Sequence, residues 1–150
     1  MESFVFLVRN NLDSALWFRP ELALTFGVLA LFVLDLFWKK SAARVAYLTA
    51  ATVAVLGIAA LLLAQQPSDA TPLFNGMIAN DAFAIFFKWI FLAGGALTVL
   101  IAGPSRAYTA SRIGPFFALL VAIVLGLFLM ASATDLLMIY MSIELVSMDM

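Results

Sequence analysis

Cysteine and histidine are both absent from the 150 residues of this chain. Without cysteine the chain can form no disulfide, cannot hold an iron–sulfur cluster through thiolates, and has no thiol nucleophile. Without histidine it has no imidazole to bind haem or zinc or to shuttle protons. We therefore expect no metal site on this chain, and we expect any redox chemistry in which the protein takes part to lie on other chains.

Charged residues are also scarce. They make up 11% of the chain, against about 25% in typical soluble domains, whereas hydrophobic residues make up 65%. Eight basic and nine acidic residues leave a net charge of -1, so no basic surface is available for nucleic acid. This composition excludes a soluble globular protein and indicates a protein of the lipid bilayer.

Five apolar runs have the length, or nearly the length, of a membrane helix, because about 20 helical residues cross a hydrocarbon core about 30 Å thick. The runs show no alternation of period two, which would indicate a transmembrane β-barrel. They predict an all-α membrane protein, a multi-pass transmembrane helical bundle. The 16 residues of the last run are too few to cross, so we expect a truncated span and a chain that is a fragment of a longer protein. The five expected spans are 20–38, 45–64, 82–102, 113–133 and the incomplete 135–150.

The loops predict how the bundle is oriented. The second loop, residues 65–81, contains acidic residues and no basic one. Because basic loops face the cytoplasm, we expect the N-terminus on the outer side of the cell inner (plasma) membrane. Residues 1–19 then form an interfacial segment on that outer side. The basic residues of the first and third loops, which contain no acid, are Lys39, Lys40, Arg44, Arg106 and Arg112.

Three acidic residues near span ends have structural explanations. Asp35 lies one helical turn before Lys39, and the two can pair at the edge of the membrane. Asp81 and Asp135 directly precede the third and fifth spans, where a carboxylate complements the helix N-terminus. We therefore expect none of the three to take part in chemistry.

Glu144 has no such explanation. It lies nine residues after Asp135, which places it about 13.5 Å deep, near the middle of the bilayer. An ionised carboxylate there costs about 2.5–3.5 kcal/mol, so Glu144 must be neutral, paired or facing internal water. Tyr140 and Ser147 lie on the same helix face and offer hydroxyls. The structural alternative is a protonated glutamate that joins two helices by a hydrogen bond.

Lys88 also lies well inside a span, seven residues after Asp81 and about 10.5 Å deep. If the third and fifth spans are neighbours, Lys88 can pair with Glu144, whose depth is within about 3 Å of its own. A cation that moves toward or away from a buried acid drives a proton off or onto that acid. Such a pair is the minimum arrangement that couples charge movement to proton transfer. The alternative is that Lys88 extends back along its own helix toward Asp81.

Four segments together carry a resemblance to a known family. In order along the chain they are PELAL and LDLFW in the first span, DAFAIFFK entering the third, and DLLMIYMSIELVSM in the fifth. The sequence resembles the N-terminal third of the subunit N family of proton-pumping NADH-quinone oxidoreductase, respiratory complex I. The resemblance covers nearly the whole chain, and the segment in the fifth span is its most specific part.

This resemblance implies an antiporter-like membrane subunit that conducts protons while partner subunits oxidise NADH and reduce quinone. NADH, FMN, iron–sulfur clusters and quinone would then be bound by those partners, and this chain would contact the lipid bilayer and other membrane subunits of complex I. In the family a glutamate of the motif Glu-Leu-x-Ser lies on the proton path, and Glu144 matches it. Only Glu144 is carried over from the family, and the role of Lys88 is inferred from its position alone. We expect the chain to be inactive on its own. The alternatives are a subunit of a multisubunit cation/proton antiporter and a purely structural subunit of a membrane complex.

Overall fold

Helices dominate the computed structural model, which describes residues 18–37, 44–66, 71–73, 78–103 and 113–148. Among these residues four helices are long and apolar enough to cross a membrane, and each begins and ends within one residue of an expected span. The multi-pass helical fold is thereby confirmed. The expected interfacial segment at 1–19 falls almost entirely outside the described residues. The helices are α2 (Arg19–Phe37), α3 (Arg44–Ala64), α4 (Ala82–Ala102), α5 (Ile113–Ser132) and the shorter α6 (Leu136–Met148).

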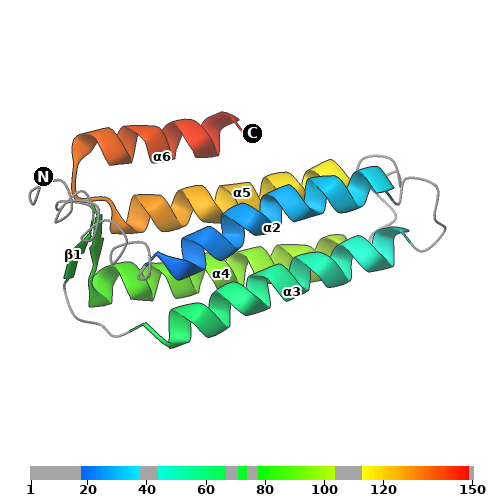
Figure 1. Cartoon of the computed structure of the whole chain (residues 1–150), viewed down its shortest axis with the longest axis horizontal. Helices are drawn as coiled ribbons and strands as arrows, with labels where there is room; N and C mark the ends of the chain where they lie inside the picture. The colour runs from blue at the N-terminus through cyan, green and yellow to red at the C-terminus, as the bar shows by residue number, and fades with distance from the viewer. Residues whose placement is uncertain (1–17, 38–43, 67–70, 74–77, 104–112, 149–150) are drawn as a thin grey trace, which may run out of the picture.

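The four long helices run side by side, and consecutive ones point in opposite directions (Figure 1). Helix α5 is the central element, since it contacts α2, α3, α4 and α6. Helix α6 packs along α5 and lies outside the bundle that α2 to α5 form (Figure 1). At Gly126 a side-chain Cβ would lie 2.6 Å from Val146 Cγ2, so the contact between α5 and α6 depends on the absence of a side chain there.

The core between the long helices is made of aliphatic side chains and a few phenylalanines. Its members recur at intervals of three and four residues, which places them on one face of each helix. Large apolar side chains also cover the outside of the bundle, including Phe26, Leu61 and Ile101, as expected for a protein surrounded by lipid or by other membrane subunits. The fully buried members of the core are Leu24, Leu31, Leu48, Ala59, Ala84, Val99, Phe117, Ala118, Val121 and Phe128.

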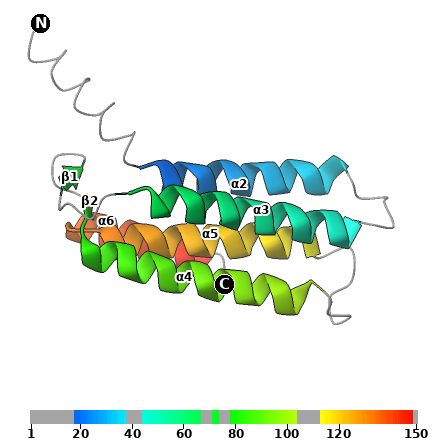
Figure 2. The same ribbon diagram turned by 90° about the horizontal axis from the view of Figure 1, so that it is seen from below.

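A short β-hairpin precedes α4. Its strands β1 (Thr71–Leu73) and β2 (Ile78–Asn80) are antiparallel, with Thr71 opposite Asn80. Ile78 also forms a bridge to Ala133, directly after α5. The hairpin therefore lies at the end of the bundle where α4 and α6 begin (Figure 2). We expected only a loop between 65 and 81, because strands of three residues are too short to show a period in the sequence.

Candidate functional site: two buried ion pairs and an exposed glutamate

The first ion pair joins α2 to α4 inside the bundle. The Lys88 ammonium donates a hydrogen bond of 2.6 Å to Glu21 Oε1 and a longer one of 3.4 Å to Asn80 Oδ1. Glu21 is 1% exposed and Lys88 is 2% exposed. The ammonium also lies 5.8 Å from the centre of the Phe128 ring, a distance at which cations and aromatic rings attract each other. Four elements, α2, β2, α4 and α5, thus surround one positive charge.

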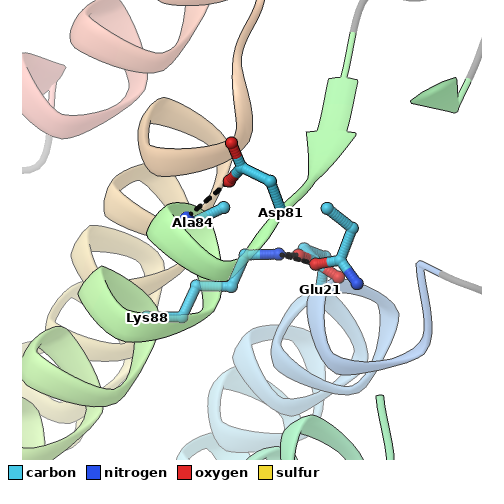
Figure 3. A network of polar contacts seen from close by, with 5 residues as sticks. Glu21, Asp81, Ala84 and Lys88 are labelled. Carbon is cyan, nitrogen blue, oxygen red and sulfur yellow. Dashed lines mark hydrogen bonds and ion pairs between the residues drawn. The ribbon is translucent and has the colours of Figure 1, made fainter. Parts of the chain in front are cut away.

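The local sequence explains how the pair forms. Helices α2 and α4 begin at the same end of the bundle (Figure 1). Asp81 ends the hairpin and caps α4, because its side chain accepts a hydrogen bond of 2.8 Å from the backbone N–H of Ala84. Lys88 follows nearly two turns later, and helical side chains lean toward the N-terminus. Figure 3 shows Lys88 extended in this way to Glu21, in the first turn of α2.

Several polar atoms at this end of the bundle lack a partner among the described residues. They are Glu21 Oε2, Asn80 Nδ2 and the hydroxyl of Ser132, and all three are buried. Ser132 lies one turn after Phe128 on α5 and therefore on the same helix face. The described protein atoms therefore do not satisfy every hydrogen-bonding group of the cluster around Lys88. Each buried polar atom left without a hydrogen bond costs about 1–3 kcal/mol of folding free energy.

The second ion pair lies at the other end of the bundle, between the last turn of α2 and the first residue of α3. Arg44 Nε donates a hydrogen bond of 3.0 Å to Asp35 Oδ1, and a second guanidinium nitrogen binds the same oxygen. The carboxylate also lies against the first turn of α5, because a Cβ on Gly114 would overlap it. We expected Lys39 as the partner of Asp35. Lys39 lies outside the described residues, so that pairing stays a prediction; within the described residues Arg44 is the partner of Asp35.

The structure does not bring Lys88 and Glu144 together. Lys88 is buried against α2, whereas Glu144 is exposed on α6. The alternative expected for Lys88, a contact with Asp81, is not formed either, since Asp81 caps α4 (Figure 3). Both expectations considered only charges within or flanking the third and fifth spans, and neither included Glu21 of the first span.

Glu144 lies on the side of α6 that no described helix covers. Tyr140, one turn earlier, is 66% exposed, and Ser147 is exposed as well. Ser147 donates its hydroxyl hydrogen bond to the backbone oxygen of Glu144, at 3.1 Å, and not to the carboxylate. Within α6 it is Ser142 that is buried. The Glu144 carboxylate is therefore open to whatever packs against the free side of α6.

These features define the class of the protein. It is a multi-pass helical membrane protein with six charged side chains within its described helices. Four of them, Glu21, Asp35, Arg44 and Lys88, are buried as two ion pairs. The other two, Arg19 and Glu144, are exposed. Among the described residues no three His, Cys, Asp or Glu side chains gather in a way that could hold a metal ion.

Curated proteins place the chain more narrowly, although no family model matches it. Over 148 residues it is 71% identical to "NADH-quinone oxidoreductase subunit N" of Anaeromyxobacter sp. (strain Fw109-5), a match that covers 99% of this chain and 29% of the relative. The protein of the same name from Chlorobium chlorochromatii (strain CaD3) is 37% identical over 133 residues, or 87% of this chain and 26% of the relative. "NADH-quinone oxidoreductase subunit N 2" of Sorangium cellulosum (strain So ce56) is 35% identical over 151 positions, or 92% of this chain and 29% of the relative.

The chain therefore belongs to the NADH-quinone oxidoreductase subunit N family over the segment that it spans. That segment is less than a third of the length of these relatives.

Proposed function

We propose that the chain is part of an antiporter-like membrane subunit of an NADH-quinone oxidoreductase, in which electron transfer from NADH to quinone drives proton translocation. The observation that carries this proposal is the identity of 71% over 99% of the chain to a protein with that name. The four apolar helices that could cross a membrane agree with it. Because the chain covers 29% of that relative, the activity belongs to the whole subunit in its complex, and the chain alone is inactive.

Glu144 is the residue to which we give the proton-carrying role. It falls in the Glu-Leu-x-Ser motif and lies about 13.5 Å along the helix from Asp135. Its carboxylate is exposed on α6, amid exposed apolar side chains such as Met141 and Ile143. A carboxylate on such a surface is costly in lipid, so we infer that further protein of the subunit or complex covers it and supplies its proton partner.

The remaining parts of the reaction fall to partner subunits. NADH, FMN, iron–sulfur clusters and quinone would bind there, and for the clusters the absence of cysteine and histidine from this chain supports that assignment. The partners of this chain are then other membrane subunits of complex I and the bilayer. Helices α2 and α4 end at the end of the bundle where α3 and α5 begin (Figure 1). The basic residues in the sequence between them, at 38–43 and 104–112, favour an inner (plasma) membrane location with the N-terminus outside.

The experiment that tests the proposal replaces Glu144 with Gln in the full-length subunit, within its complex. Membrane vesicles are then assayed for NADH oxidation and for NADH-driven proton uptake. Glutamine keeps the shape of the side chain but cannot carry a proton, so we expect proton uptake to fall by roughly tenfold or more, since positioned proton-transfer groups contribute roughly 10²–10⁴-fold.

Asp135→Asn is the matched control, because it neutralises an exposed carboxylate at the start of the same helix region. It should leave proton uptake unchanged. Normal proton uptake by an assembled Glu144→Gln complex would contradict the proposal and would favour the structural alternative, in which the glutamate only joins helices.

A further inference from the structure

The two buried ion pairs differ in the chemistry that is open to them. Asp35 is paired with an arginine, which is not deprotonated in proteins. Glu21 is paired with a lysine, whose ammonium can lose a proton when it is buried. Both members of the Glu21–Lys88 pair are at most 2% exposed, so both charges pay a desolvation cost that the neutral forms do not pay. Of the two ion pairs, only the Glu21–Lys88 pair therefore has a base that can pass its proton to the acid.

The hydrogen-bonding of the two clusters differs as well. In the described part of the chain, Asp35 and Arg44 have no buried polar side-chain atom that lacks a hydrogen bond. In the other cluster, Glu21 Oε2 and Asn80 Nδ2 are buried and lack one. These two atoms belong to side chains that share one ammonium, at 2.6 Å and 3.4 Å. One is an acceptor and the other a donor, which is what a water molecule needs on its two sides.

From these observations we propose that Glu21, Lys88 and Asn80 form an internal water-binding site within which a proton is exchanged. In the exchange a Lys88 N–H bond breaks and a Glu21 O–H bond forms, so the ammonium and carboxylate become a neutral amine and a neutral carboxylic acid. The water accepts a hydrogen bond from Asn80 Nδ2 and donates one to Glu21 Oε2. The Ser132 hydroxyl, which is also buried without a described partner, lies on the α5 face that Phe128 presents to Lys88 and extends the site toward the hairpin.

The groups that face the ammonium come from every element packed around it. Helix α2 contributes Glu21, β2 contributes Asn80, and α5 contributes the uncharged ring of Phe128. The nearest other acid on α4 or the hairpin, Asp81, is engaged with the backbone of Ala84. Among the described residues the proton therefore has one carboxylate to move to, and these side chains together hold no net charge before or after the move.

The first test looks for the bound water directly, in the complex without any substitution. A density map of the complex in lipid, at a resolution that shows ordered water elsewhere in this subunit, should contain a water within hydrogen-bonding distance of Glu21 and Asn80. A dry site in such a map would overturn the proposal. This test does not depend on whether the complex pumps protons.

The second test concerns the proton exchange between Lys88 and Glu21, and it rests on the proposed function. Lys88→Arg keeps the positive charge and the ion pair but removes the ability to deprotonate. Arg44→Lys is its matched control, since it exchanges one base for the other at the opposite ion pair. Both are made in the full-length subunit, and assembly, NADH oxidation and proton uptake are measured in vesicles. We expect Lys88→Arg to lower proton uptake per NADH oxidised by roughly tenfold, within the contribution of a positioned proton-transfer group, and Arg44→Lys to leave it unchanged.

Arginine is larger than lysine, so Glu21→Gln serves as a second variant in case the first does not assemble. Its glutamine accepts the Lys88 hydrogen bond but no proton, and it should lower proton uptake as Lys88→Arg does. Normal uptake in either assembled variant, alongside a loss in Glu144→Gln, would refute the proton exchange and leave the proposed function intact. Normal proton uptake in Glu144→Gln would refute the proposed function. The presence or absence of water density near Glu21 and Asn80 would then be the test of the water-binding site.

Discussion

Gly114→Ala should break the ion pair between Asp35 and Arg44 without altering either residue. Gly114 is buried in the first turn of α5, and a methyl group there would overlap the Asp35 carboxylate. The carboxylate would have to leave the position in which it accepts both guanidinium hydrogen bonds. The side chains of Arg44 and Asp35 are 6% and 10% exposed, so water cannot replace the lost contacts.

The size of the effect follows from this burial. Leaving one member of a buried ion pair without its partner costs about 3–5 kcal/mol. We therefore expect Gly114→Ala to lower the free energy of unfolding by about 3 kcal/mol, the lower end of that range, because the displaced carboxylate keeps some electrostatic attraction to Arg44. Far-ultraviolet circular dichroism of the protein in mixed micelles, with a rising fraction of denaturing detergent, would measure this change.

Gly57→Ala on α3 is the control, because a Cβ there would meet nothing within 4 Å. It should be neutral, or stabilising by up to about 1 kcal/mol through helix propensity. A double variant gives a sharper test. In an Asp35→Ala background the same Gly114→Ala change should cost little, since the group that it displaces is gone. Equal stability of Gly114→Ala and Gly57→Ala would refute the reasoning.

Two further predictions concern the end of the bundle that carries the hairpin and the orientation of the chain. Asp81→Ala removes the cap of α4 and should lower the free energy of unfolding by about 0.5–2 kcal/mol, whereas Asp81→Asn should recover most of the loss; thermal unfolding of the two variants distinguishes a cap from a charge effect. Because the chain has no cysteine, a single cysteine at Ser41 or at Ser68 reports its side of the membrane. An impermeant thiol reagent added outside intact cells should label Ser68→Cys and spare Ser41→Cys, and the reverse pattern would contradict the orientation.

The spans could be predicted because an apolar run of about 20 residues is a requirement of the bilayer itself. Helix α4 begins and ends as expected, at 82 and 102. Its start was marked by Asp81, whose short side chain is suited to a helix cap. The hairpin was missed because three-residue strands are fixed by pairing with each other and with Ala133, which no local pattern in the sequence reveals.

The partner of Lys88 could not be deduced with the same ease. Glu21 lies 67 residues earlier, and a sequence does not show how helices are rotated against one another. One signal was present all the same. The first and third spans enter from the same side, and a lysine side chain that leans toward the start of its helix can reach the first turn of a neighbour. Comparing the depths of Cα atoms alone favoured Glu144, because it ignored the length and direction of the lysine side chain.

The separation of paired charges along the chain has a consequence for synthesis. Asp35 and Arg44 are nine residues apart, so α2 and α3 can neutralise each other as soon as both have left the ribosome. Glu21 must wait for α4, since its partner follows 67 residues later. Until then the acid at the start of α2 lies without its lysine, and an unpaired acid is costly within the membrane. This cost favours a first helix that stays shallow, or within the insertion machinery, until α4 arrives.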